Sequence, residues 1–237
     1  MCGRYTLAGP DPSQVRERFA LGPEVEVRRR WNVAPQDDVV AVRTDRDGRR
    51  RGDLLRWGLV PFWAEDPRVG ARMINARAET VAEKPAFRDA LRGRRCLIAA
   101  DGFYEWQPRP DRPRKQPFHI TRTDGAPFAF AGIWASWRPK GAADEVEPLR
   151  TCSIITTAAN ARIADIHDRM PVILLPQDEA AWLDTDAEVG DVLPLLRPLP
   201  DGLTARREVG YAVNDARHDA PDCLDPPQPE PQGALFD

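Results

Sequence analysis

LIAADGFYEW at residues 97–106 begins the part of the sequence that decides the fold. Three further runs rich in β-branched and aromatic residues follow it, namely PFHITR at 117–122, PFAFAGIWASW at 127–137 and TCSIITT at 151–157. Glycine, proline or aspartate separates these runs, which is typical of short strands joined by turns. No alternation of strands with long helices is present, so a parallel doubly wound sheet is not expected.

The flanking sequence adds further short strands and a few short helices. We predict strands at 38–43, 54–60, 171–175 and 204–209, and helices after Asp11-Pro12 and at 85–92, 158–166, 176–183 and 189–196. The expected fold class is α+β: a single domain of mixed or antiparallel β-sheets, barrel-like, with short peripheral helices. The domain is expected to span residues 1–218, and the Pro-rich acidic residues 219–237 to form a flexible tail.

Charge is distributed unevenly along the 237 residues, whose net charge is −3. Residues 1–122 carry 25 Lys and Arg against 17 Asp and Glu, whereas residues 123–237 carry 9 against 20. The net charge argues against a uniformly basic nucleic-acid binder, but the first half has enough arginine for a local basic groove. No secretory signal or membrane-spanning run is present, so a cytoplasmic, nucleoid-associated location is expected. The protein is also expected to be a monomer.

Cys2 is the most informative of the four cysteines. A small residue at position 2 favours removal of Met1, which would leave Cys2 with both a free α-amine and a thiol. These groups have ordinary pKa values of about 8 and about 8.5, so both are partly nucleophilic near neutral pH. An aldehyde would form a Schiff base with the amine, and the thiol would then close a thiazolidine ring. Ring-opened abasic deoxyribose is such an aldehyde.

The other cysteines have no expected chemistry. Cys96 and Cys152 lie in strand-like runs and are expected in the core, and Cys223 lies in the predicted tail. Their spacing matches no zinc template, and no nucleotide-binding glycine motif is present. We therefore expect neither a metal nor a cofactor.

Eight blocks of sequence run in order through the chain: MCGRYTL at 1–7, WNVAPQ at 31–36, RWGLVPFWA at 56–64, MINARAET at 73–80, RRCLIAADGFYEW at 94–106, FAFAGIWASW at 128–137, TCSIITTAAN at 151–160 and IHDRMPVIL at 166–174. In these blocks the chain resembles the SOS response-associated peptidase (SRAP) family, whose members shield abasic sites in single-stranded DNA.

The resemblance implies four catalytic residues: Cys2, Asn75, Glu105 and His167. Asn75 would orient the α-amine or hold the sugar hydroxyls. Glu105 lies among aromatic residues, so its carboxyl would be partly desolvated and suited to proton transfer in the Schiff-base steps. His167, with an ordinary pKa of about 6.5, would protonate the sugar ring oxygen and help to open the aldehyde.

The resemblance also implies six DNA-contacting residues: Arg4, Pro35, Trp63, Arg77, Thr156 and Arg169. The three arginines would contact phosphates, with the Thr156 hydroxyl near them. Pro35 and Trp63 would lie on loops beside the groove. Trp63 would stack on bases, at roughly 1–3 kcal/mol per base, or else pack in the core.

The implied reaction is covalent capture of the lesion as a thiazolidine, a lyase-like chemistry. The Schiff base also acidifies the adjacent hydrogen, so strand cleavage by β-elimination is possible, and the peptidase label would refer to self-removal of Met1. Two alternatives remain open. An N-terminal nucleophile amidohydrolase or amidotransferase also uses a cysteine at position 2, and a non-covalent single-strand binder would share the basic half and the tryptophan-rich loops.

The last residues suggest a partner. Gln232, Leu235 and Phe236 match the Gln-x-x-Leu-Phe pattern of peptides that bind the bacterial sliding clamp, and they follow a Pro-rich spacer. Binding to the clamp would raise the local concentration of the protein at replication forks.

Overall fold

The computed structural model describes residues 2–9, 11–45, 47–111, 113–143 and 145–228. Its strands are β1 (Tyr5–Leu7), β2 (Arg30–Val33), β3 (Asp38–Thr44), β4 (Arg50–Trp57), β5 (Asn75–Arg77), β6 (Arg95–Ala100), β7 (Gly102–Gln107), β8 (Gln116–Arg122), β9 (Phe128–Trp137), β10 (Leu149–Ala158), β11 (Arg169–Pro171), β12 (Ile173–Leu174) and β13 (Thr204–Glu208).

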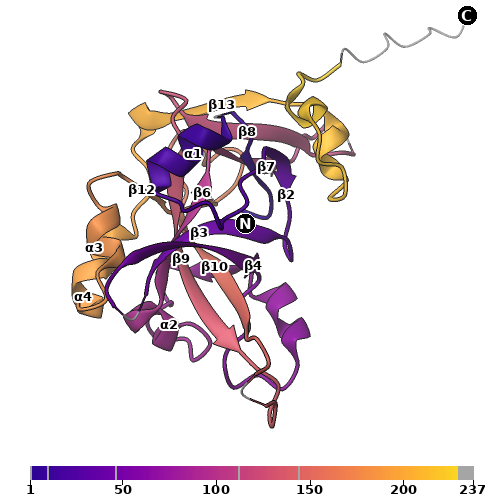
Figure 1. Ribbon diagram of the computed structural model, residues 1–237. Helices are drawn as coiled ribbons and strands as arrows, with labels where there is room; N and C mark the ends of the chain where they lie inside the picture. The colour runs from indigo at the N-terminus through magenta and orange to yellow at the C-terminus, as the bar shows by residue number, and fades with distance from the viewer. Residues whose placement is uncertain (1, 10, 46, 112, 144, 229–237) are drawn as a thin grey trace, which may run out of the picture.

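The helices are short and lie around the strands (Figure 1). They are α1 (Pro12–Phe19), α2 (Arg88–Gly93), α3 (Glu179–Leu183) and α4 (Val189–Val192), with 3-10 turns η1 (Pro67–Arg72), η2 (Leu193–Leu195), η3 (Asp201–Leu203), η4 (Tyr211–Asn214) and η5 (Pro221–Leu224). Asp11 caps α1 as the sequence predicts, because its side chain accepts from the backbone N–H of Ser13.

The strands form two sheets, one of which closes on itself. Strands β10, β4, β3, β6 and β9 pair in that order, and β9 pairs again with β10 to complete a five-stranded barrel. Strand β5 runs parallel to β10 at its edge, and the second sheet has the order β13-β8-β7-β1-β2. The predicted α+β fold with mixed, barrel-like sheets and short peripheral helices is therefore confirmed.

Two apolar clusters account for most of the core. Alternate residues of β6 point to opposite faces, with Leu97 in the cluster that the helices cover and Ile98 in the other. The second cluster joins the barrel to the five-stranded sheet, since Trp57 and Phe130 of the barrel pack against Tyr5 of β1. The N-terminal segment is thus fixed between the two sheets.

Buried hydrogen bonds also hold β1 in place. Thr6 donates its hydroxyl to Asp101 at 2.5 Å, and the other carboxylate oxygen of Asp101 accepts the backbone N–H groups of Ala8, at 2.8 Å, and Gly9. Burial lowers the pKa of His119 to about 3, so its ring is neutral, and its Nε2 lies 3.0 Å from the Thr6 hydroxyl oxygen. The strand that follows Cys2 therefore has a defined position.

Two local predictions are wrong. Residues 161–166 form turns rather than part of a helix over 158–166, because β10 extends to Ala158 and Asn160 donates its side-chain amide to Leu199 O and Thr204 Oγ1. The strand predicted at 54–60 is β4, which starts at Arg50 in the hairpin with β3 and ends at Trp57.

The flexible tail is predicted to start at residue 219, but the folded part of the chain extends further. Asp219 accepts hydrogen bonds from β2, and Cys223 is fully buried against Tyr104 and Val213, so residues 219–224 belong to the folded domain. Gln232, Leu235 and Phe236, which carry the predicted clamp peptide, lie outside the described residues. No helix in the described part of the chain is long and apolar enough to cross a membrane.

Candidate active site

Cys2 lies three residues before the start of β1 and is fully buried in the cluster between the two sheets. Its thiol points to the backbone oxygen of Arg4, with Sγ 3.9 Å away. Burial, together with the negative charge of Glu105, raises the pKa of the thiol. The sulfur is therefore protonated at rest. The backbone N–H of Tyr104 donates to the Arg4 oxygen over 3.0 Å, so the segment that begins with Cys2 runs beside the strand that carries Glu105.

Asn75 connects β5 to the N-terminal segment. Its Nδ2 donates to the backbone oxygen of Cys2 over 2.8 Å, which fixes the position of that residue. Strand β5 is set in place by its pairing with β10, where Asn75 lies opposite Ile154. The Oδ1 atom of Asn75 is buried and accepts no hydrogen bond within the described residues, so an acceptor for a new N–H or O–H donor lies beside Cys2.

Glu105 is the buried acid of the site. It lies on β7, next to β1 in the sheet, and is 2% exposed. Burial raises its pKa from 4.5 to about 7, because the charged carboxylate loses solvation there. The carboxyl group therefore exchanges its proton close to neutral pH, as general acid–base catalysis requires.

His167 ends the turn segment 161–167 and is partly exposed. Burial lowers the pKa of its ring. The backbone N–H of Arg169 donates to Nδ1 over 2.9 Å, and Asp168 Oδ1 lies 2.9 Å from the same nitrogen. The first contact requires an unprotonated Nδ1 and the second a protonated one, so this nitrogen has a partner in either charge state.

A surface pocket of about 510 Å³ brings Glu105 and His167 together. Its other lining residues are Arg4, Trp106, Arg114, Lys115 and Asn214. Three of them are cations, so the pocket that holds the candidate acid and base also has the charge to bind a phosphate. Cys2 and Asn75, which are hydrogen-bonded to each other, are not among its lining residues.

The two loop residues predicted beside the groove occupy neighbouring loops. Trp63 is 53% exposed and Phe62 beside it is 61% exposed, so Trp63 is not a core residue. Pro35 is half-buried in the β2–β3 turn. Gly58 has φ 133°, and an added Cβ would lie 2.6 Å from Gly70 O, so the loop carrying Trp63 requires glycine there.

Three further predicted DNA contacts lie on β5, β10 and β11, which pair side by side. Arg77 is exposed and has no ion-pair partner in the described part of the chain. Thr156 is fully buried, and its backbone oxygen accepts from Arg169 Nη2 over 2.6 Å. The Arg169 guanidinium also pairs in two places with Glu79, at 2.7 and 2.9 Å. Arg77 is thus directly accessible, whereas Arg169 is engaged by a carboxylate.

Sequence reasoning missed several residues that shape the pocket. Arg114 and Lys115 line it, and the cationic run before β8 could have indicated them. Asn32 is fully buried and holds Arg4, although it lies within the WNVAPQ block. No sequence signal predicts Asp219, because its partners are backbone groups of β2 that lie far away in the sequence.

Possible metal ligands gather elsewhere. Ligand atoms of His218, Asp222 and Cys223 lie within 4.8 Å of one another, in the C-terminal segment rather than in the pocket. His218 Nε2 and Asp222 Oδ1 already pair at 2.7 Å, so this geometry needs no ion to explain it.

Comparisons with known proteins agree on one family. The family model described as SOS response associated peptidase (SRAP) matches residues 1–216. The abasic site processing protein YoqW of Bacillus subtilis is 41% identical over 230 residues, which cover 95% of this chain and 99% of that protein. The abasic site processing protein YedK of Escherichia coli is 34% identical, with 77% of this chain and 79% of that protein covered.

Solved structures share the fold. A protein from Bacteroides thetaiotaomicron superposes with a TM-score of 0.83, covering 96% of this chain and 100% of that one, at 24% identity. A protein from Bordetella bronchiseptica gives a TM-score of 0.73 at 29% identity and covers 88% and 100% of the two chains.

Proposed function

Because this chain belongs to the SOS response associated peptidase family, we propose that it recognises abasic sites in single-stranded DNA and binds them covalently through Cys2. Its family relatives are named abasic site processing proteins, which supports DNA carrying this lesion as the partner. Two observations support the proposal: Glu105 and His167 line one cationic pocket, and Asn75 donates to the backbone oxygen of Cys2, the residue whose buried thiol feels the charge of Glu105.

The proposed reaction starts once Met1 has been removed. The α-amine of Cys2 adds to the C1′ aldehyde and gives a carbinolamine. Protonated Glu105 donates its proton to the departing hydroxyl, water leaves, and an iminium ion forms. The thiol of Cys2 then adds to the iminium carbon and returns its proton to Glu105. The product is a thiazolidine, and the only molecule released is water.

The site favours this order of steps. The thiol is buried and protonated, so the amine is the first nucleophile and sulfur attacks second. Asn75 fixes the Cys2 carbonyl, and its free Oδ1 is suited to accept from the amine or from a sugar hydroxyl. A pKa of about 7 allows Glu105 to donate a proton and to take it back at the same pH.

His167 is proposed to open the sugar. Its ring lines the pocket beside Glu105, and a proton on the ring transferred to the sugar ring oxygen would release the aldehyde. Asp168 would then partner the ring whenever it is charged. Single-stranded DNA is the preferred substrate because C1′ enters the pocket without displacement of a partner strand.

Two further activities are proposed, one from the same intermediate and one that precedes it. The Schiff base acidifies the hydrogen next to C1′, so β-elimination and strand cleavage compete with ring closure by the thiol. Self-removal of Met1 would use the Glu105 and His167 pair as proton-transfer groups. Both are proposed as secondary to shielding of the lesion.

A denaturing gel tests the proposal. The protein is mixed with a single-stranded oligonucleotide carrying one abasic site, with and without borohydride. Wild type is expected to give a retarded band without reductant. Cys2→Ala keeps the α-amine but lacks sulfur, so it should give a band only when borohydride reduces the Schiff base. Cys96→Ala removes an equally buried thiol from β6 and should behave as wild type.

The same assay separates the alternatives. A wild-type protein that binds the oligonucleotide reversibly but never covalently would be a simple single-strand binder. Hydrolysis of glutamine by the purified protein would favour the amidohydrolase reading. A band that survives denaturation in Cys2→Ala without borohydride would contradict the proposed role of the sulfur.

A further inference from the structure

The C-terminal segment over residues 213–219 holds the pocket arginine, and we propose that Asp219 is a positioning residue that acts through Asn32 on Arg4. This inference rests on the proposed function, because it concerns how the same pocket binds DNA phosphate. The family model ends at residue 216, so Asp219 lies beyond the part of the chain that it matches.

Within the described residues, the guanidinium of Arg4 donates two hydrogen bonds, both from Nη1. It donates to Asn32 Oδ1 over 3.0 Å and to the backbone oxygen of Val213 over 2.8 Å. These bonds use only the Nη1 nitrogen of the guanidinium, and the side chain lines the pocket with Glu105 and His167. The other guanidinium donors of Arg4 are therefore available for a phosphate oxygen.

Asn32 links Arg4 to the C-terminal segment. The residue is fully buried on β2, and its Nδ2 donates to the backbone oxygens of Val213, Asp215 and His218 over 3.3, 2.9 and 2.7 Å. Three carbonyl oxygens surround the amide nitrogen, so the amide oxygen must face Arg4. The orientation that supports Arg4 thus depends on a segment far away in the sequence.

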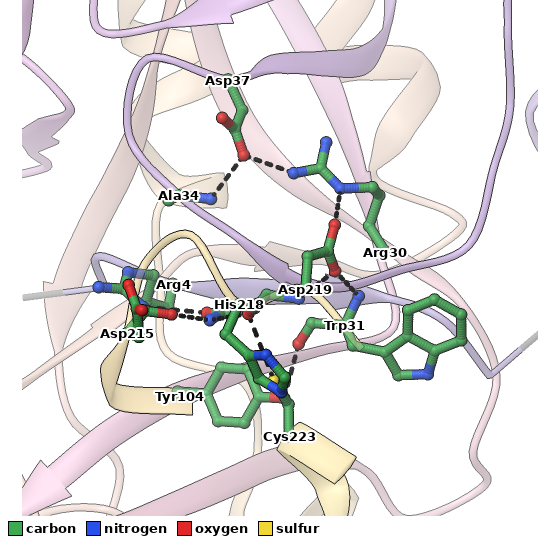
Figure 2. Close-up of polar contacts among 11 residues, drawn as sticks. Arg4, Arg30, Trp31, Ala34, Asp37, Tyr104, Asp215, His218, Asp219 and Cys223 are labelled. Carbon is green, nitrogen blue, oxygen red and sulfur yellow. Dashed lines mark hydrogen bonds and ion pairs between the residues drawn. The ribbon is translucent and has the colours of Figure 1, made fainter. Parts of the chain in front are cut away.

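Asp219 fixes that segment against β2 (Figure 2). Its Oδ1 accepts the backbone N–H groups of Trp31 over 2.6 Å and of Asn32 over 3.0 Å, and its Oδ2 accepts from Arg30 Nε. Arg30 donates in turn to Asp37 over 2.5 Å, in the turn that carries the loop residue Pro35. The Asp219 carboxylate therefore joins the segment directly to the backbone of Asn32 and, through Arg30, to the β2–β3 turn.

The consequence is specific to phosphate binding. Without Asp219, residues 213–218 lose the carboxylate link to the backbone of β2, so the three acceptors of the Asn32 amide are less firmly fixed and the Arg4 guanidinium is held less precisely at the pocket. The residues that carry out the chemistry, Cys2 and Glu105, make no described contact with Asp219. Asp219→Ala is therefore expected to weaken DNA binding and to leave the chemical step intact.

A double-mutant cycle tests this path. We compare wild type, Asp219→Ala, Arg4→Ala and the double variant, measuring the half-saturating concentration of abasic oligonucleotide, the capture rate at saturation, and binding of the same oligonucleotide without the lesion. Arg4→Ala should weaken binding about tenfold, the effect of one charge-assisted contact, and Asp219→Ala about fivefold. The double variant should match Arg4→Ala, because the two changes remove the same contact.

Salt dependence gives a readout that a general loss of stability would not move. Each lost phosphate contact should reduce the slope of log affinity against log salt by about 0.7 for single strands. Both single variants should show this reduction, and the double variant should show it only once. The saturating capture rate should stay within about twofold of wild type in Asp219→Ala.

Two control variants separate positioning from stability. Asp222→Asn changes an exposed carboxylate in η5, which follows the segment, and this carboxylate pairs with His218. The variant should bind DNA as wild type does. Tyr104→Phe removes the hydrogen bond that the Tyr104 hydroxyl donates over 2.7 Å to the carbonyl oxygen of Trp31, the neighbour of Asn32 on β2. This variant should lower the melting temperature without changing the salt slope. If Asp219→Ala is not recovered folded, Asp219→Asn replaces it, since one acceptor oxygen remains.

Independent, multiplicative effects of the two substitutions, or an unchanged salt slope in Asp219→Ala, would overturn the inference. Absence of covalent product in wild type would instead remove the proposed function. The positioning role would then still be decided by binding of the undamaged oligonucleotide.

Discussion

Replacement of Glu105 by glutamine should make the protein more stable at alkaline pH while it impairs catalysis. Burial raises the pKa of this carboxyl from 4.5 to about 7, so the folded chain holds the proton more tightly than the unfolded chain does. Below pH 4.5 the group is protonated in both states and has no effect. As pH rises from 4.5 to above 7, the unfolded chain loses this proton before the folded chain does. Wild type therefore loses about 3 kcal/mol of stability, since one pKa unit corresponds to about 1.4 kcal/mol.

Denaturant unfolding of wild type and Glu105→Gln at about pH 4 and at about pH 8 measures this effect. The difference in unfolding free energy between the variant and wild type should grow by about 3 kcal/mol in favour of the variant at the higher pH. Glu83→Gln, at an exposed position, should show no such growth. A difference that does not change with pH would refute the assignment of Glu105 as a buried group that ionises near neutrality.

Three other perturbations test separate parts of the account. Trp63→Ala should weaken binding to single-stranded DNA about tenfold without lowering the melting temperature, because the exposed ring is proposed to stack on bases, at roughly 1–3 kcal/mol each. Unchanged affinity in an anisotropy titration would remove that role. Glu79→Gln should release Arg169 from its carboxylate partner. The affinity for single-stranded DNA should then rise several-fold, and the slope of log affinity against log salt should steepen by about 0.7. A lower affinity would contradict a phosphate contact by Arg169. Deletion of residues 230–237 should abolish binding to a sliding clamp in surface plasmon resonance and leave capture of abasic DNA unchanged; persistent clamp binding would exclude the terminal peptide.

Much of the fold could be predicted because its signals are local. The strands from 97 to 157 are short apolar runs bounded by turn residues, and α1 has its capping residue immediately before a proline. The predicted helix at 158–166 failed because Asn160 binds backbone and side-chain groups from residues 199–204, a contact that no local pattern reveals. Barrel closure likewise depends on a pairing between distant segments, since β10 runs parallel to β4 with Thr151 opposite Arg56.

The site also has residues that the sequence predicts and supporting residues that it does not. Cys2, Asn75, Glu105 and His167 stand in recognisable sequence blocks, and the structure shows Asn75 bonded to Cys2 and the other two in one pocket. The supporting layer could not be predicted, because Asp219 acts through backbone N–H groups. Its acidic, proline-rich surroundings in the sequence are typical of a flexible tail.

The most direct test is the intact mass of the adduct formed with an abasic oligonucleotide. The account predicts a mass equal to the chain without Met1 plus the oligonucleotide minus one water, with the modification on the Cys2 peptide after digestion. An adduct that retains Met1, or one attached at another residue, would contradict covalent capture through the amine and the thiol of Cys2.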